Sequence, residues 1–352
     1  MVGIMVRRLL VVLAGLSGVL IGSADGWAQQ GPPPSQPGAA PPPVGNSVST
    51  FTAGPSTANA VLEGATQGLG GSQNVFKGAL ASHATGVRGF AAGDGPSRIG
   101  LWTNLAGTWF EEDQVALSSS GTIATGLVGA DYRINDWFIL GLSAGYERQD
   151  ITTHFNLGSI DSNGYIVAPY LLVQLIPDQL FLDLSGGYVG AGQTIDRTLS
   201  GRAVSGSPDA QRVFTTATLQ ANLERGAWRL RPETGVLWLN QHIDGYAESS
   251  GIYIPGSNAP LGRFHVGSRI AYNFGRIEPY ALAQFEYDFK TSSTTVDVGL
   301  PQPSTRRTGG VLGTGVLFQL MPGLFGGLQF SASVGRADYA QYNLGGTLRY
   351  GF

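Results

Sequence analysis

Histidine and serine side chains are the first candidates for catalysis in this sequence, because a base beside a hydroxyl can produce an activated nucleophile. The four histidines are His83, His154, His242 and His265. In the stretch HVGS, Ser268 follows His265 by three residues, an odd spacing that puts the two side chains on opposite faces of a strand. His154 and His242 fall in expected loops. The sequence therefore supports no nucleophile–base pair, and we predict that the protein is not an enzyme.

Metal and cofactor sites are also unsupported by the residue types. The histidines are scattered, and the 352 residues include no cysteine, which excludes disulfides and thiolate metal ligands. We therefore predict no cofactor and no metal. Charged residues make up only 13% of the chain and the net charge is −3, so no basic stripe indicates a nucleic acid partner.

The charged residues of the second half of the chain alternate with apolar ones, which is the two-residue period of a strand. In WRLRPETGVLW, Trp228 and Leu230 fall on one face, and Arg229 and Arg231 fall on the other. An arginine that faces lipid at the midplane costs about 2–4 kcal/mol, so in a membrane the arginine face must look inward. A soluble β-sandwich would alternate in the same way, and alternation alone does not separate the two.

The same period continues along other strands. After the turn RIND, Phe138, Leu142 and Tyr146 share one face, while Ser143 and Glu147 take the opposite face. Reading each strand in this way predicts ten charged residues on the inward face. They are Asp131, Arg133, Asp183, Arg229, Arg231, Glu233, Arg269, Glu286, Asp288 and Arg349.

Turn residues divide the chain after Arg98 into strands of similar length. Five short turns are centred on Asn135, Asp178, Gly226, Gly275 and Pro322. Six longer polar stretches alternate with them, near residues 111–121, 148–161, 191–210, 241–262, 290–307 and 335–341. Eleven connections join twelve strands, so we predict an all-β fold, a 12-stranded antiparallel up-and-down transmembrane β-barrel. Alternating short and long connections are typical of outer-membrane barrels, with short turns in the periplasm and long loops outside.

Aromatic residues cluster near the ends of the predicted strands, where a membrane interface selects them. We assign Trp109, Trp137, Phe138, Trp228 and Trp238 to such interfacial belts. The alternative is that these side chains are ordinary core aromatics. The short turns recur about every 45 residues. Repeats of about 45 residues also occur in soluble propellers, but each propeller repeat contains four short strands rather than two long ones.

The N-terminal part of the chain has a different composition. Residues 1–28 read as a signal peptide, with two arginines, an apolar run and small residues before the expected cleavage; an uncleaved anchor helix is the alternative. Residues 29–56 are a Pro-rich linker. Residues 57–97 are Gly-rich, and their best helix covers about 72–90. The barrel is expected over residues 98–352.

Residues 98–352, about seventy per cent of the chain, resemble the C-terminal translocator domain of autotransporters, the type V secreted proteins of Gram-negative bacteria. LWTNLAGTWF (Leu101 to Phe110) is similar to the first strand of that domain. GLVGADYRINDWFILGLSAGYERQD (Gly126 to Asp150) is similar to its second hairpin, and SNGYIVAPYLLVQL (Ser162 to Leu175) to its fourth strand. LGGTLRYGF (Leu344 to Phe352) resembles its ending.

The resemblance implies a lumen that holds a threaded helix and lets unfolded chain pass. NVFKGALASHATGVRG resembles the helix that precedes the first strand and enters the lumen. The inward charges then either serve this passage or simply neutralise one another inside the barrel. Family members that cleave themselves use an Asn–Asn junction, whereas Asn59 and Asn74 are isolated here, so we predict no self-cleavage. The family usually carries a long passenger, but only about 70 Pro- and Gly-rich residues separate the expected cleavage site from the first strand.

The resemblance also implies location and partners. We expect a monomer in the lipid bilayer of a Gram-negative outer membrane, with the general secretion pore, a signal peptidase, periplasmic chaperones and the barrel-assembly machinery as partners. The assembly signal is predicted on one face of the last strand, in Tyr342, Leu344, Leu348, Tyr350 and Phe352. The expected function is translocation or anchoring of a short N-terminal segment at the cell surface. The alternative is a pore-forming or structural barrel, porin-like, with no secreted passenger.

Overall fold

The computed structural model describes residues 98–113, 118–291, 307–337 and 339–351. The predicted signal peptide (1–28), linker (29–56) and helix (about 72–90) lie outside these residues. Nearly all the described residues form strands, and within these ranges no helix is long and apolar enough to cross a membrane.

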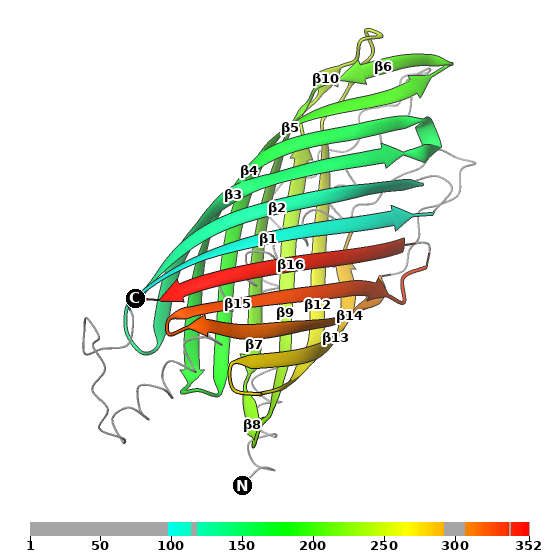
Figure 1. Cartoon of the computed structure of the whole chain (residues 1–352). Coiled ribbons are helices and arrows are strands. Elements are labelled where there is room, and N and C mark those ends of the chain that lie inside the picture. The colour runs from blue at the N-terminus through cyan, green and yellow to red at the C-terminus, as the bar shows by residue number, and fades with distance from the viewer. Residues whose placement is uncertain (1–97, 114–117, 292–306, 338, 352) are drawn as a thin grey trace. The chain divides into compact units, whose positions relative to one another are not determined.

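The strands form one antiparallel sheet that closes on itself (Figure 1). The barrel strands are β1 (Ile99–Glu112), β2 (Ser119–Arg133), β3 (Phe138–Thr153), β4 (Gly158–Ile176), β5 (Leu180–Leu199), β7 (Asp209–Ala221), β9 (Trp228–Ile243), β12 (Ser257–Tyr272), β13 (Ile277–Lys290), β14 (Thr308–Met321), β15 (Leu324–Val334) and β16 (Tyr339–Gly351). The connections contain β6 (Arg202–Gly206), β8 (Leu223–Arg225), β10 (Tyr246–Ala247), β11 (Tyr253–Ile254) and a 3-10 helix, η1 (His154–Asn156).

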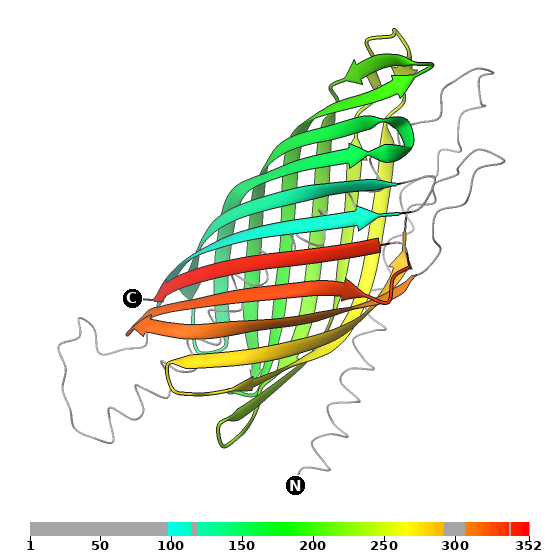
Figure 2. The same ribbon diagram turned by 45° about the vertical axis from the view of Figure 1, so that its right-hand side comes forward.

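The barrel closes where the last strand meets the first. β16 pairs with β1 from Gly100 opposite Gly351 to Glu112 opposite Tyr339. Figure 2 shows β16, in red, running beside β1, in cyan. On the far side β9 pairs with β12, so each of the twelve barrel strands has a partner on both edges. The predicted 12-stranded up-and-down barrel is confirmed.

The short turns form at the predicted positions because their residues suit tight geometry. The Asn135 Oδ1 accepts hydrogen bonds from the backbone N–H groups of Trp137 and Phe138, at 2.8 and 3.0 Å. In the β12–β13 turn, the Asn273 Oδ1 accepts one from the Gly275 N–H at 2.7 Å, and Gly275 has a φ of 94°, which favours glycine.

The connections at the other end are more ordered than the sequence suggested. Residues 148–161 were expected to be a long loop, yet β3 runs to Thr153 and β4 begins at Gly158. The strands extend because alternation continues: Ile151 and Ile160 pair across the hairpin, and both side chains are buried. The loop is therefore only a short turn at the end of a long hairpin.

Two further connections pack on each other rather than lying separately in solvent. The Arg197 guanidinium, on β5, donates to the Glu248 carboxylate just after β10, at 2.7 and 2.8 Å, and both groups are buried. The Ser249 N–H donates to the Ser205 carbonyl of β6 at 2.8 Å. Figure 1 shows β6 and β10 together at this end of the barrel. These two polar connections are therefore partly ordered and contact each other.

Candidate functional site: the barrel interior

Side chains alternate between the buried interior and the exposed outer surface of the barrel wall. On β3, Ser143 and Glu147 are buried, while Phe138, Leu142 and Tyr146 are exposed. The ten charged residues predicted to face inward are all buried or half-buried. The interior is therefore the part of the described structure where charged groups gather.

One interior ion pair lies where the barrel closes. The Arg349 guanidinium, on β16, donates to both oxygens of Asp131, on β2, at 2.7 and 2.6 Å. The Tyr170 hydroxyl donates to the same carboxylate at 2.7 Å and accepts a hydrogen bond from the Trp102 indole N–H at 2.6 Å. A Cβ on Gly100 would collide with the Arg349 side chain, so the glycine makes room for the pair. Hydrogen bonds thus connect β16, β2, β4 and β1.

A second charged group occupies the interior near the short turns. Arg229, on β9, forms an ion pair with Glu278, on β13, and Arg231 lies 3.7 Å from the same carboxylate. Glu224, from β8, is 3.5 Å from Arg229. The buried arginines therefore have carboxylate partners, as low-dielectric surroundings require.

Arg269, on β12, uses an aromatic face instead of a carboxylate. Its guanidinium lies 4.2 Å from the ring centre of Tyr280, a cation–π contact. It also donates to the Gln329 Oε1 at 3.4 Å, and the Tyr280 hydroxyl donates to the same oxygen at 2.8 Å. The group joins β12, β13 and β15.

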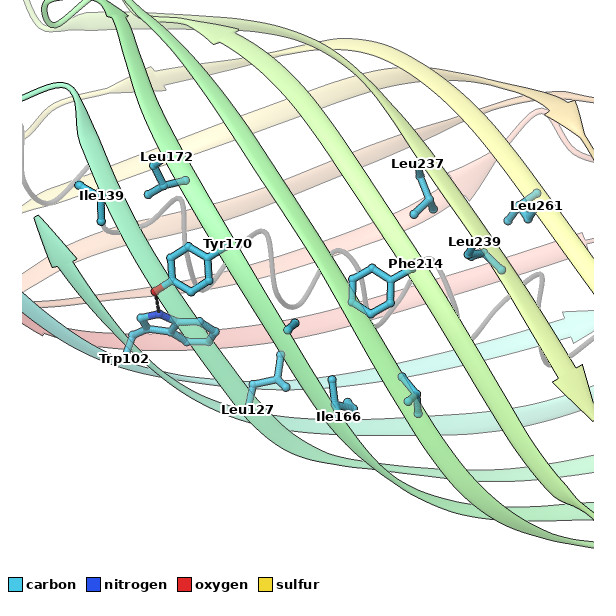
Figure 3. Close-up of a cluster of buried hydrophobic side chains, with 12 residues drawn as sticks. Trp102, Leu127, Ile139, Ile166, Tyr170, Leu172, Phe214, Leu237, Leu239 and Leu261 are labelled. Atoms are coloured by element: carbon cyan, nitrogen blue, oxygen red, sulfur yellow. Dashed lines mark hydrogen bonds between the residues drawn. The ribbon is translucent and has the colours of Figure 1, made fainter. Parts of the chain in front are cut away.

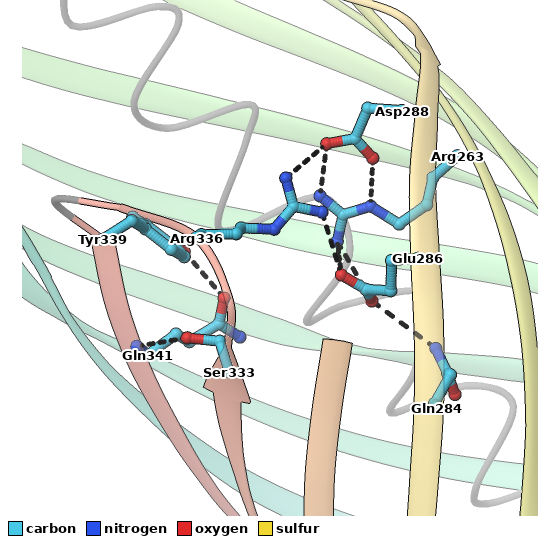
Figure 4. Close-up of polar contacts among 8 residues, drawn as sticks. All are labelled: Arg263, Gln284, Glu286, Asp288, Ser333, Arg336, Tyr339 and Gln341. Atoms are coloured by element: carbon cyan, nitrogen blue, oxygen red, sulfur yellow. Dashed lines mark hydrogen bonds and ion pairs between the residues drawn. The ribbon is translucent and has the colours of Figure 1, made fainter. Parts of the chain in front are cut away.

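A third charged group lies toward the longer connections (Figure 4). Arg263, on β12, donates to Asp288, on β13, at 2.6 and 3.2 Å. Arg336, which follows β15, donates to Asp288 at 2.8 Å and to Glu286 at 3.0 Å. All four side chains are buried. The group ties the β15–β16 connection to the wall three strands away.

The interior also has an apolar part, which the prediction of ten inward charges did not include. Figure 3 shows a cluster of buried side chains projecting from the wall, including Trp102, Tyr170 and Phe214. A second cluster lies toward the longer connections and contains Phe110, Ile123, Ile151, Ile160, Ile195, Tyr246 and Ile254. The interior is therefore mixed in character rather than uniformly polar.

Several interior charges were not in the predicted set. They are Glu147, Arg212, Arg263, Glu278 and Arg336, and Arg212 lies 3.1 Å from Glu147. Alternation from Tyr146 indicated the inward side for Glu147. Arg336 had no signal of this kind, because it lies in a connection and reaches its partners by folding back over the wall.

The ten predicted interior charges fall into four sets. Asp131, Arg349, Arg229, Arg231, Glu286 and Asp288 belong to the ion-paired groups, and Arg269 contacts Tyr280. Arg133 is half-buried at the end of β2. Asp183 and Glu233 lie on β5 and β9, on either side of β7, where Gln220 is opposite Glu233 and donates a hydrogen bond to Asp183.

A Ser–His contact does occur, but it joins Ser120 and His154 rather than Ser268 and His265. The Ser120 Oγ lies 3.0 Å from the His154 Nε2, on an exposed part of the barrel rim. Among the described residues, no carboxylate or amide hydrogen-bonds the other ring nitrogen, as a catalytic triad requires. The same ranges contain no group of three or more His, Asp or Glu side chains placed to hold a metal ion.

The outer surface carries the predicted aromatic residues. Trp109, Trp137, Phe138, Trp228 and Trp238 are all exposed. The outward side chains of β16 are exposed too: Tyr342, Leu344, Leu348 and Tyr350. Phe352 lies outside the described residues. An apolar outer face around a charged interior is the reverse of a soluble barrel and matches a lipid environment.

Comparisons with known proteins agree with this geometry. The translocator domain of the autotransporter NalP from Neisseria meningitidis has a TM-score of 0.63 at 15% identity, covering 81% of this chain and 98% of that one. The beta domain of the Bordetella autotransporter BrkA has a TM-score of 0.59 at 15% identity, covering 72% and 100%. The transport unit of AIDA-I from Escherichia coli has a TM-score of 0.57 at 13% identity, covering 80% and 99%. At these identities the likeness shows the fold.

One curated relative is an uncharacterized protein of the trpE-trpG intergenic region of Pseudomonas putida, 26% identical over 151 residues. The match covers 41% of this chain, and the chain spans about a quarter of the length of that relative.

The family match settles what the barrel is. Residues 101–331, about two thirds of the chain, match the family described as Autotransporter beta-domain. Barrels of this family lie in the outer membrane of Gram-negative bacteria, which agrees with the apolar outer face. The chain belongs to the autotransporter family, and its strands form the family's outer-membrane β-barrel.

Proposed function

We propose that this barrel translocates the segment preceding Arg98, or anchors it, at the cell surface. The observation that carries the proposal is the position of the first strand. Ile99 begins β1 opposite Tyr132, next to the short β2–β3 turn. The upstream chain therefore joins the barrel at the end with the short turns, and can reach the other end through the interior.

We infer the orientation of the barrel from the lengths of its connections. The short turns face the periplasm and the longer connections face outside, as in other outer-membrane barrels. The buried Arg197–Glu248 pair joins two of the longer connections, so these connections form a folded rim. A segment that enters from the periplasm would emerge beside this rim.

The upstream segment has two parts in this proposal. A helix at about residues 72–90 occupies the lumen, and residues 29–56 are exported or remain as a periplasmic tether. The interior ion pairs support passage, since paired charges leave a wall that holds a polar chain without binding it irreversibly. Barrel assembly and folding, rather than ATP, supply the driving force, and the barrel itself carries out no chemistry.

Export and assembly require partners. We infer the general secretion pore, a signal peptidase, periplasmic chaperones and the barrel-assembly machinery, and a monomeric barrel. The assembly machinery would read the outward row of the last strand, Tyr342, Leu344, Leu348, Tyr350 and Phe352. The double variant Leu348→Asn/Tyr350→Asn should lower the yield of heat-modifiable barrel in membranes. Normal insertion of this variant would count against the row as a signal.

The export proposal is tested by an epitope tag inserted after Gly45. Protease added to intact cells should remove the tag if residues 29–56 reach the surface. A tag that stays protected until the outer membrane is broken would contradict export. Residues 29–56 would then be a periplasmic tether. The barrel rim serves as the control, since a second tag in the β10–β11 connection should be cleaved in the same cells.

Conductance separates this function from a porin-like pore. If the upstream segment occupies the lumen, deletion of residues 29–95 should raise the single-channel conductance in planar bilayers. Equal conductance with and without these residues would favour an open pore with no secreted part.

A further inference from the structure

Two interior carboxylates differ from the rest. Asp131, Glu147 and Asp288 each pair with an arginine of the wall. Asp183 and Glu233 form no ion pair with any arginine or lysine in the described ranges. Because arginines of the wall neutralise those three carboxylates and not these two, we expect a partner for Asp183 and Glu233 from outside the wall.

The two carboxylates belong to one polar patch on neighbouring strands. Asp183, on β5, lies opposite Thr218, on β7, and Gln220 lies opposite Glu233, on β9. The Gln220 side-chain amide donates to the Asp183 Oδ2. We call these four residues the acceptor patch. The patch lies near the short turns, because Asp183 is the fourth residue of β5 and Glu233 the sixth of β9.

Acceptor atoms of this patch are buried and unsatisfied. Asp183 is only 1% exposed, and its Oδ1 has no hydrogen-bond partner. The Thr218 Oγ1 also lacks a partner. His265, on β12, is the neighbouring titratable group beside Glu233, yet no ion pair joins the two within the described structure. A buried acceptor without a donor costs free energy, so the patch is suited to receive a cationic donor.

We propose that the acceptor patch binds the guanidinium of Arg88, in the segment of this chain that precedes the barrel. This rests on the proposed function, since it places that segment in the lumen. Between residues 29 and 97 the only basic residues apart from histidine are Lys77 and Arg88. A guanidinium can donate to two carboxylates at once, which suits a patch with an acidic group on each side.

Reach selects Arg88 over Lys77. Arg88 precedes Arg98 by ten positions, and Arg98 comes just before β1 at the short-turn end. Ten residues span about 15 Å as a helix and at most about 36 Å when extended, so Arg88 can reach the short-turn half of the lumen. Lys77 precedes Arg98 by twenty-one positions, which would span about 32 Å as a helix, the full hydrocarbon thickness. Lys77 would then lie toward the outer end.

A zero-length crosslink tests the pairing on the full-length folded protein in detergent. Arg88→Lys keeps the positive charge and supplies an amine, and Lys77→Arg removes the competing upstream lysine. A carbodiimide joins an amine only to a carboxylate that contacts it. We expect an amide between position 88 and Asp183 or Glu233, identified by mass spectrometry and absent from Asp183→Asn/Glu233→Gln. In the matched control, with Arg88 and Lys77 unchanged, Lys77 should couple to neither carboxylate.

Two results overturn the inference and differ in meaning. Coupling from position 88 to Asp131, Glu286 or Asp288 would place the segment in the lumen against another part of the wall, so the patch assignment fails and the proposed function stands. Coupling to no interior carboxylate, together with unchanged conductance on deletion of residues 29–95, would overturn both.

A non-covalent measurement supplies a second test. Arg88→Gln should lower the midpoint of thermal unfolding, and it should have no further effect once Asp183→Asn/Glu233→Gln is present. Fully additive shifts would show that Arg88 and the patch do not interact.

Discussion

Arg349 and Asp131 are held together by two hydrogen bonds of 2.7 and 2.6 Å, although 218 residues separate them in the sequence. Their strands, β16 and β2, flank β1, so the ion pair reaches over the first strand. Gly100, on β1, leaves the space that the guanidinium occupies. The pair therefore fastens the closure of the barrel from the inside.

Removing one partner of this pair should destabilise the barrel strongly. Asp131→Ala leaves the buried Arg349 without its carboxylate, and breaking a buried pair in this way typically costs about 3–5 kcal/mol. We expect a corresponding loss in the free energy of unfolding, measured in urea by the heat-dependent shift in gel mobility.

Controls separate the lost pair from a general effect of removing a charge. Asp150→Ala removes the carboxylate of an exposed pair with Arg148, which should cost at most about 1 kcal/mol. Asp131→Leu/Arg349→Met removes both charges and should regain much of the stability. Equal losses for Asp131→Ala and Asp150→Ala would contradict the role given to the closure pair.

Gly141 is predicted to be required by the ring beside it. A Cβ at Gly141 would overlap the Tyr170 ring, whose hydroxyl holds Asp131. Gly141→Ala should therefore lower the free energy of unfolding by about 1–3 kcal/mol. Gly186→Ala is the matched control, because its Cβ would meet only ordinary contacts at 3.6 Å. A Gly186 variant that is as unstable as the Gly141 variant would refute this reading.

Strand positions and faces were predictable because both depend on local residues. Alternation assigned Leu142 outward and Ser143 inward, and Asn135 and Gly275 marked short turns at which the chain reverses. In a membrane every strand edge must be paired, because lipid offers no hydrogen bonds. These local features together with that requirement predict a closed barrel of twelve strands.

The partners of the interior charges were not predictable, because pairing depends on strand stagger. Arg229 meets Glu278 and Arg212 meets Glu147 only once the register of several strands is known. Arg336 reaches Glu286 from a connection that has no alternating pattern. The extended β3–β4 hairpin was missed for another reason: its polar residues resemble those of a loop.

The end of that hairpin should respond to pH. Asp150 and Asp161 face each other across β3 and β4, four residues beyond the Tyr146–Tyr165 pair, and their outward polar side chains place them above the bilayer. A hydrogen bond from Arg148 lowers the pKa of Asp150. The hydrogen bond that Asp161 shares with Asp150 raises the pKa of Asp161, and burial and Asp196 raise it further.

The sign follows from the raised pKa of Asp161. The folded hairpin holds this proton more tightly than the unfolded chain, whose aspartate has a pKa of about 3.9. The contribution of Asp161 to hairpin stability is therefore largest at low pH and is lost as the pH rises through its folded pKa. The lowered pKa of Asp150 has the opposite effect. Its contribution to hairpin stability is present above the ordinary pKa of aspartate and is lost as the pH falls through its folded pKa.

Amide hydrogen exchange across residues 148–161 can check this pH dependence. In the wild-type protein, protection corrected for intrinsic exchange should fall as the pH rises above about 4, the ordinary pKa of aspartate. Asp161→Asn should raise protection at pH 7 and remove the pH dependence. Asp209→Asn, an exposed aspartate at the start of β7, should leave the hairpin unchanged. Unaltered pH dependence in the Asp161 variant would contradict the shared proton.

The last prediction concerns the side of the wall that meets lipid. Leu142 lies on the outer face of β3, four residues from Phe138 at the turn and four from Tyr146 toward the outer rim, and it is 55% exposed. This spacing places Leu142 near the midplane. Leu142→Arg should then cost about 2–4 kcal/mol in the free energy of unfolding, measured by urea titration in lipid vesicles.

Leu157 provides the matched substitution. It lies in the turn after η1 and is 79% exposed, but its position beyond both hairpin strands puts it in water. Leu157→Arg makes the same chemical change and should alter stability by no more than about 0.5 kcal/mol. If the two arginines have the same effect, the outer face of β3 is not in lipid. A large difference requires that the apolar surface around Leu142 lies in hydrocarbon, because no buried partner is removed by either change.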